Sequence, residues 1–202
     1  MEIFEIAVSN DGYISCRSNF CSAQDFLSND LSYKFLPGTN IMRGEIDSGN
    51  WAVSYLLSMY KHRMRDFILF QQPEVSVNCK PLPLCEFSEL SCYMDRLYPL
   101  FCGKRSVERL IKQGLKRSKL SYSCNDVCKL FCLDSDRIQR SLNGVGNEIF
   151  RAMAAIGFSY GKEVFCFPWL SKRRFEYYSK NLSILLEILE SLNKVVIVPI
   201  GE

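Results

Sequence analysis

The 202-residue sequence has a single histidine, His62, and no lysine between Lys34 and Lys61. It has no run of 18 consecutive apolar residues, which is the length that a membrane-spanning helix needs. The net charge of +3 is too small to indicate nucleic-acid binding by itself. Four polar residues interrupt the start of the chain after Met1: Glu2, Glu5, Asn10 and Asp11. We therefore expect no signal segment, no membrane span and a cytoplasmic location.

Cysteine, in contrast, is abundant, with ten residues. A chain of this length buries roughly 70% of its unfolded surface and needs no disulfide. In a reducing cytosol we expect most cysteines to be small buried hydrophobes. Cys124, Cys128 and Cys132 are spaced to share one helix face, which would also suit a metal. One helix rarely supplies a closed thiolate site and no Cys-x-x-Cys pair is present, so core packing is favoured and no metal site is predicted.

The hydrophobic pattern predicts an α/β fold. Strands are expected at 2–9, 12–16, 40–44, 67–70, 163–167 and 194–200. Helices are expected at 51–63, over much of 88–141, and at 147–158 and 175–192. Asn10-Asp11-Gly12 predicts a hairpin turn, and the proline-rich segment 71–86 is predicted to be irregular. Apolar strands separated by helices indicate a parallel sheet covered on both faces.

Two basic stretches have two interpretations each. One runs from Lys104 to Lys119, and the other is Lys172-Arg173-Arg174 at the start of the last predicted helix. Either stretch would suit nucleic acid or acidic lipid. A solvated helix face is the commoner explanation and is the one favoured here. Nucleic acid is therefore not an expected partner.

Residues 44–51, Gly-Glu-Ile-Asp-Ser-Gly-Asn-Trp, carry the glycine spacing of a phosphate-binding loop. Gly44 and Gly49 hold the glycine positions, between a predicted strand and a predicted helix. Asn50 stands where the phosphate-binding lysine belongs, and Trp51 stands where the Mg²⁺-binding hydroxyl belongs. The candidate cofactor-binding residues are Gly44, Asp47, Ser48, Gly49, Asn50 and Trp51. The pattern predicts a P-loop NTPase-like frame, with Trp51 favoured as a core residue that fills the phosphate site.

Further segments follow in an order that resembles the nucleotide-binding domain of ABC-type ATPases. They are 36–52 (strand and Walker A loop), 91–101 (Q-loop region), 127–134 (helix before the signature), 141–148 (signature), 164–171 (Walker B strand) and 194–201 (strand before the switch histidine). The resemblance implies one domain over 1–202. It implies a P-loop NTPase-like parallel-sheet core with flanking helices, an N-terminal antiparallel β portion and a helical insert at about 88–160.

The residues that the resemblance would make catalytic are replaced. Met94 or Asp95 takes the place of the Q-loop glutamine, segment 164–171 has no carboxylate, and Ile200 or Gly201 takes the place of the switch histidine. Losing one preorganised group commonly costs ~10²–10³-fold in rate. The sequence therefore predicts no catalytic residues and no hydrolysis of ATP by the family mechanism. Backbone amides could still hold an anion, but no cofactor is predicted, because Glu45 and Asp47 carry negative charge.

The predicted function is that of a catalytically inactive ABC-ATPase-like protein, a binding, regulatory or accessory subunit of an ABC transport system. By the resemblance, which implies head-to-tail dimers, its partner is an intact ABC ATPase, a membrane permease or a second copy. A membrane partner would place it at the inner membrane face. The expected partner surfaces are 44–52 and the signature-like residues Leu142, Asn143, Gly144, Val145, Gly146, Asn147 and Glu148. Two alternatives stay open: an ATP-binding subunit with residual or partner-dependent activity, and a protein that binds nucleic acid through a basic helix.

Overall fold

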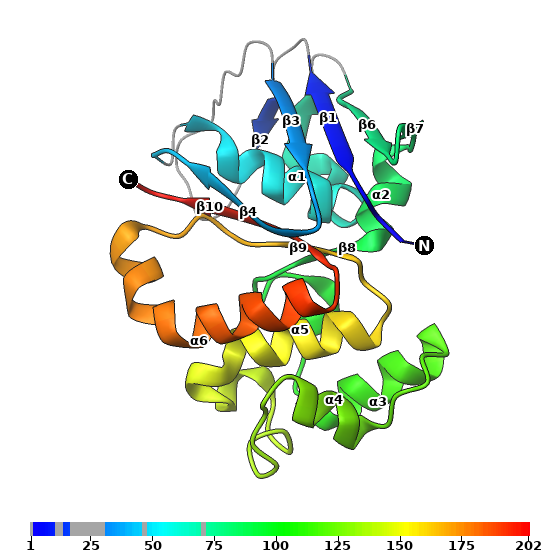
Figure 1. Cartoon of the computed structure of the whole chain (residues 1–202), viewed down its shortest axis with the longest axis vertical. Helices are drawn as coiled ribbons and strands as arrows, with labels where there is room; N and C mark the ends of the chain where they lie inside the picture. The colour runs from blue at the N-terminus through cyan, green and yellow to red at the C-terminus, as the bar shows by residue number, and fades with distance from the viewer. Residues whose placement is uncertain (1, 11–13, 17–30, 46–47, 70–71) are drawn as a thin grey trace.

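The computed structural model describes residues 2–10, 14–16, 31–45, 48–69 and 72–202. The elements form layers, which Figure 1 shows from top to bottom. An antiparallel sheet comes first, then helix α1 (Asn50–Arg63), then a parallel sheet. Helices α5 (Ile149–Ser159) and α6 (Lys172–Ser191) cover the other face of the parallel sheet. This is the α/β architecture that the sequence predicts.

The parallel sheet has four strands in the order β4-β10-β9-β8. They are β4 (Gly38–Arg43), β10 (Val195–Ile200), β9 (Val164–Cys166) and β8 (Ser91–Tyr93). All six residues of β10 are buried, as the continuous apolar run of a central parallel strand requires. Because the strands are parallel, their carboxyl ends meet at one edge of the sheet.

The antiparallel sheet has the order β3-β1-β6-β7. Its strands are β1 (Ile6–Asn10), β3 (Leu31–Phe35), β6 (Glu74–Val77) and β7 (Lys80–Pro81). The predicted hairpin between β1 and β2 (Ile14–Cys16) is wrong, because β1 pairs with β3 on one side and with β6 on the other. Both edges of β1 are therefore occupied, and β2 pairs with β5 (Phe67–Leu69) instead. The predicted turn residues Asp11 and Gly12 lie outside the described residues.

The helices divide into one buried helix and several peripheral ones. The first eleven residues of α1, Asn50 to Tyr60, are all buried. Such a helix, buried on every side, belongs between two layers rather than at a surface. Helices α3 (Val107–Ser118) and α4 (Cys124–Leu130) lie beyond α5 on the side away from the parallel sheet, as Figure 1 shows. No helix in the described part of the chain has the length and apolar character to span a membrane.

Two local predictions are corrected by the structure. The segment predicted to be irregular contains β6, β7 and the start of α2 (Leu84–Leu90). The predicted helical run after residue 88 is interrupted by β8, whose three residues are too few to show a period. The helix predicted at 51–63 is α1, and η2 (Met64–Asp66) follows it directly. Short 3₁₀ turns also occur at Pro99–Phe101 (η3), Leu142–Gly144 (η4) and Gly146–Glu148 (η5).

Gly114 marks a close approach between α3 and α5. A Cβ at this position would lie 2.6 Å from Cδ2 of Tyr160 and 2.9 Å from the carbonyl carbon of Ser159. Alanine is the better helix former by about 1 kcal/mol, but overpacking costs about 1–3 kcal/mol. We expect Gly114→Ala to lower the free energy of unfolding by up to about 2 kcal/mol in urea titrations. The exposed Lys116→Ala serves as the control, and a stabilised Gly114→Ala would show that the two helices are not closely packed.

His62 provides a pH dependence of stability. Its ring packs edge-on against Tyr98 at 5.4 Å between centroids. Burial, with help from the charges of Lys162 and Lys61, lowers the pKa of His62 below its usual 6.5. The unfolded chain therefore takes up a proton before the folded chain does, and stability falls as the pH drops below about 6.5. We expect the urea midpoint to fall between pH 7.5 and 5.5, and His62→Gln to flatten that change. If the urea midpoint of His62→Gln fell with pH as it does in the wild type, His62 would not be the source of the pH dependence.

Candidate functional site

Segments following all four parallel strands meet at the carboxyl edge of the sheet. The glycine loop follows β4, Met94 follows β8, Phe167 follows β9 and Gly201 follows β10. In open α/β sheets, ligands bind in the crevice outside the carboxyl ends of the strands. This edge is therefore the candidate site, and the motif-like segments predicted from the sequence lie around it, except the signature-like segment and segment 127–134, which belongs to the peripheral α4 region.

The glycine loop makes a tight turn before α1. The backbone N–H of Ser48 donates to the carbonyl of Glu45 at 3.0 Å. Gly49 has the left-handed φ of 82° and caps α1, with its carbonyl accepting from the N–H groups of Ala52 and Val53. A Cβ on Gly44 would lie 2.7 Å from the side chain of Ser48 and 3.1 Å from Nδ2 of Asn50. Glycine at this position therefore lets two side chains of the loop approach the backbone.

Asn50 ties the loop to both sheets. Its Nδ2 donates to the carbonyl of Arg43 at the end of β4, at 2.9 Å. Its Oδ1 accepts the hydroxyl proton of Tyr33 on β3, at 2.8 Å. The side chain is buried, with 8% of its surface exposed. At the position of the P-loop lysine, the amide of Asn50 is thus directed back across the loop.

Removing the Asn50 amide should be costly, because the partner groups would lose their hydrogen bonds inside the protein. Leaving buried polar groups unsatisfied costs about 1–3 kcal/mol. We expect Asn50→Ala to lower the free energy of unfolding by about 2 kcal/mol in chemical denaturation. Tyr33→Phe removes only one of the two bonds and should lose about half as much. Equal stabilities of wild type and Asn50→Ala would show that these bonds contribute nothing.

The indole of Trp169 closes the other side of the loop. Its Nε1–H donates to the carbonyl of Gly44 at 3.2 Å. A Cβ on Gly201 would lie 2.9 Å from Cζ2 of this ring, so the end of β10 approaches the indole closely. The backbone N–H of Gly44 also donates to the carbonyl of Ile200 at 3.0 Å. The segments resembling the Walker B extension and the switch region are therefore joined to the glycine loop by hydrogen bonds and ring packing.

Trp51 is a core residue, as the sequence favoured. It is 5% exposed and packs against Tyr55 with 6.2 Å between ring centroids. Tyr55 in turn contacts Phe67 and Tyr93. That Trp51 fills the phosphate site stays a prediction, because these contacts do not involve the glycine loop. The indole that forms a hydrogen bond with the loop is that of Trp169.

A hydroxyl does meet the Walker B-like segment, but from further along α1. Ser54 is fully buried, and its Oγ donates to the carbonyl of Phe167 at 2.6 Å. This bond joins helix α1 to the backbone after β9 and uses the hydroxyl for structure. Among the loop carboxylates, Glu45 is exposed, and Asp47 lies outside the described residues.

The signature-like segment lies away from the loop, before α5, and is partly internal. Leu142 and Val145 are buried, whereas Asn143, Gly144, Gly146 and Asn147 are exposed. Glu148 is 9% exposed and binds two arginines: its Oε1 lies 3.3 Å from Arg137 and 3.6 Å from Arg151. Its Oε2 accepts the backbone N–H of Asp134 at 3.3 Å. Glu148 therefore holds neighbouring segments together, and the exposed residues are the ones that a partner can reach.

The cysteines are less buried than predicted. Of the eight cysteines whose side chains are described, all are free, and only Cys92, Cys128 and Cys166 are buried. Burial raises the pKa of the Cys128 thiol to about 12. Cys132 lies beyond the end of α4 with φ of 50°, so the three spaced cysteines do not share one helix face. The described residues hold no cluster of three or more His, Cys, Asp or Glu placed to bind a metal ion.

The two basic stretches are exposed. In α3 the buried residues are Val107, Leu110, Ile111 and Gly114, which leaves the cations outside. Arg105, Arg109, Lys112 and Lys116 line a shallow hollow on this helix. Lys172, Arg173 and Arg174 are exposed at the start of α6. This exposure suits a solvated helix face and equally suits binding of nucleic acid or acidic lipid.

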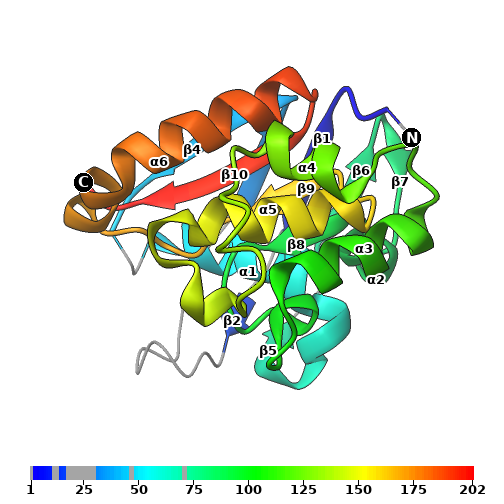
Figure 2. The ribbon, with the colours of Figure 1, turned by 90° about the horizontal axis from the view of Figure 1, so that it is seen from below.

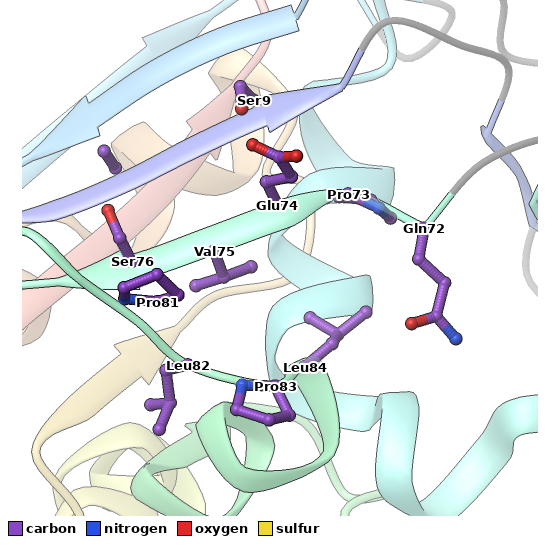
Figure 3. A pocket seen from close by; sticks show the side chains of 11 residues that line it. Ser9, Gln72, Pro73, Glu74, Val75, Ser76, Pro81, Leu82, Pro83 and Leu84 are labelled. Carbon is purple, nitrogen blue, oxygen red and sulfur yellow. The ribbon is translucent and has the colours of Figure 1, made fainter.

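A separate hollow of about 410 Å³ lies on the antiparallel side, where β1 and β6 meet the start of α2. Figure 3 shows Ser9, Ser76 and Glu74 on its sheet wall, with Leu82 and Leu84 opposite. Glu74 is its only charged lining residue. This hollow shares no lining residue with the glycine loop, so it is not part of the carboxyl-edge site.

The amino-acid sequence matches no protein-family model and no curated protein sequence. The structure is similar to an ABC transporter ATP-binding protein from Pyrococcus furiosus, with a TM-score of 0.62 and 14% identity, covering 98% of this chain and 90% of that one. It is also similar to cbiO1 from Clostridium perfringens, part of the ABC transporter complex cbiONQ, with a TM-score of 0.66 and 12% identity, covering 100% and 80%.

A third similar structure is a bacterial Atm1-family ABC exporter with ATP bound, with a TM-score of 0.62 and 9% identity. The match covers 99% of this chain and 34% of the exporter. The chain therefore has the fold of the ATP-binding domains of ABC transporters, which confirms the resemblance at the level of the fold. At these identities the similarity concerns the fold alone.

Proposed function

We propose that this protein is a non-catalytic ABC-ATPase-like subunit that works by binding a partner. The observation that carries the proposal is the position of Asn50. Its amide bonds to the carbonyl of Arg43 and to the hydroxyl of Tyr33. A P-loop would direct a lysine from the same position to the β- and γ-phosphates.

The residues at the carboxyl edge do not suit Mg·ATP. Phosphoryl transfer by this fold depends on charges that position the phosphates and the metal. An asparagine amide carries no net charge, and the indole of Trp51 offers only an N–H donor and no oxygen for Mg²⁺. The segment from Val164 to Ser171 contains no carboxylate. These features support a structural role for the loop.

The partner in this proposal is an intact ABC ATPase, a membrane permease or a second copy of the chain. Two of the similar structures are described as an ABC exporter and as part of an ABC transporter complex. The residues Asn143, Gly144, Gly146 and Asn147 are exposed and open to such a contact. A membrane partner would hold the protein peripherally at the inner membrane face.

A phosphate-release assay at saturating Mg·ATP tests the proposal. We expect the same background release from wild type, from Gly49→Ala and from a protein-free control. Circular dichroism would establish that Gly49→Ala is folded, since its φ of 82° disfavours a side chain. Saturable turnover in the wild type that Gly49→Ala abolishes would sink the proposal in favour of an active ATP-binding subunit.

A further inference from the structure

A second concave site lies beyond the carboxyl ends of β8 and β9. It is a hollow of about 350 Å³ formed by the segments after these two strands and the first turns of α5 and α6. These two helices lie on the same face of the parallel sheet (Figure 2). Ligand pockets in proteins commonly occupy about 300–1,000 Å³, and the carboxyl edge of an open α/β sheet is their usual place. No residue of the glycine loop lines this hollow.

An aromatic series runs from the core to this hollow. Phe167 packs against Phe150 at 5.5 Å, and Phe150 meets Tyr178 edge-on at 5.2 Å. Tyr178 then meets Tyr177 at 4.9 Å, and Tyr177 is 73% exposed. Phe150 and Tyr178 line the hollow, together with the buried Met153. A flat aromatic ligand would meet aromatic rings and a polarisable thioether here.

Charged groups lie beside this aromatic wall. Arg96 and Arg174 line the hollow and are exposed, so their guanidinium groups can meet a ligand without breaking a buried ion pair. Asp95 also lines it, but its Oδ1 accepts the backbone N–H of Leu97 at 2.9 Å. The three side chains leave a net positive charge, and arginine pairs with carboxylates and related anions through two parallel hydrogen bonds.

Other hollows on the described surface lack this combination. The hollow in Figure 3 has Glu74 as its only charged lining group, which disfavours an anion. The hollow on α3 is lined by cations and Gln113, with no aromatic ring. The hollow beside Ile41 contains Phe175, but its Arg43 and Lys172 are balanced by Glu176 and Glu202.

We propose that the hollow between the starts of α5 and α6 binds a small organic anion with an aromatic ring, such as an aromatic carboxylate. The ring lies against Phe150, Met153 and Tyr178, and the anionic group pairs with Arg174 and Arg96. This site is separate from the glycine loop and does not depend on the proposed lack of ATP hydrolysis.

The aromatic sulfonate 8-anilinonaphthalene-1-sulfonate is a fluorescent probe of this chemistry. Titrated into the full chain, it should bind saturably at one site. Arg174→Gln should weaken binding about tenfold or more, because a charge-assisted hydrogen bond is lost. Arg173→Gln is the matched control: it removes the same charge from the next residue, which is exposed but does not line the hollow. Its affinity should stay within about twofold of wild type, as expected for a screened surface charge.

Competition separates anion recognition from general hydrophobic binding. Phenylacetate should displace the probe, whereas the neutral 2-phenylethanol should do so at least about tenfold less well, since it cannot form the charge-assisted pair. Equal weakening by Arg173→Gln and Arg174→Gln would overturn the proposal, as would non-saturating fluorescence or equal competition by the two compounds. None of these measurements involves ATP, so their failure would leave the proposed function of the glycine loop untouched.

Discussion

Replacing Trp51 with alanine is expected to lower the free energy of unfolding by about 3–5 kcal/mol, the usual cost of deleting a buried large aromatic side chain. The indole is 5% exposed and begins a series of ring contacts through Tyr55 to Phe67 and Tyr93. These rings join α1 to both β5 and β8. Urea unfolding monitored by far-ultraviolet circular dichroism gives the difference directly.

Two further variants separate packing from chemistry at this position. Trp51→Phe keeps a ring and should lose less stability than Trp51→Ala. Trp51→Ser restores the hydroxyl that a P-loop uses for Mg²⁺, yet it should be destabilised like Trp51→Ala and should gain no ATP hydrolysis. If Trp51→Ala cost less than about 1 kcal/mol, the residue would not be part of a packed core.

Replacing Glu148 with alanine is the second large expected effect, again about 3–5 kcal/mol of unfolding free energy. Removing one member of a buried ion pair leaves the other charge without compensation. Here the stranded group is Arg151, which is 9% exposed and whose remaining contact is a 2.6 Å hydrogen bond to the carbonyl of Cys132. The carboxylate also accepts the N–H of Asp134, so that bond is lost as well.

Arg137→Ala is the matched control for Glu148. The Arg137 side chain is 44% exposed and contacts the same carboxylate. Exposed ion pairs are worth about 0–1 kcal/mol, so this variant should remain near wild-type stability. If Glu148→Ala and Arg137→Ala lost similar amounts of unfolding free energy, the stabilising partner of the carboxylate would be Arg137 rather than the buried Arg151. If Glu148→Ala left the free energy of unfolding unchanged, the ion pair of Glu148 with Arg151 would contribute no more than a surface ion pair.

The parallel sheet could be predicted because its strands have the composition of buried strands. The apolar run at Val195–Ile200 has no polar side to offer solvent, so it had to lie inside a sheet covered on both faces. The strand of Ser91–Tyr93 could not be found in the same way. Three residues contain too little of a period, and this strand forms because β9 offers a parallel edge to it.

The contacts of the candidate site were hidden from sequence reasoning because they join distant segments. The spacing of Gly44 and Gly49 predicted the loop, but nothing in the sequence pairs Asn50 with Tyr33 on another sheet. Trp169 lies in segment 164–171, and nothing in the sequence pairs it with Gly44. Its bond to Gly44 spans 125 residues and depends on how the two strands are placed relative to each other. The glycines were therefore good evidence for the fold and poor evidence for what the loop contacts.

The burial of individual residues in the signature-like segment could not be predicted from the sequence either. From the sequence, all seven residues from Leu142 to Glu148 were assigned to a partner surface. The structure turns Leu142, Val145 and Glu148 inward and leaves the intervening polar and glycine residues outside. A carboxylate next to exposed residues can be buried if cations meet it, and the two arginines that do so lie on different segments.

The central claim, that the glycine loop is held closed and does not take Mg·ATP, is tested most directly by the two indole N–H resonances of the ¹⁵N-labelled protein, which has only two tryptophans. Trp169 donates from Nε1 to the loop carbonyl of Gly44, so a phosphate entering the loop must perturb its signal. The account predicts that both resonances keep their positions when Mg·ATP is added to millimolar concentration. A saturable shift of the Trp169 resonance with Mg·ATP, absent with Mg²⁺ alone and absent in Gly49→Ala, would contradict it.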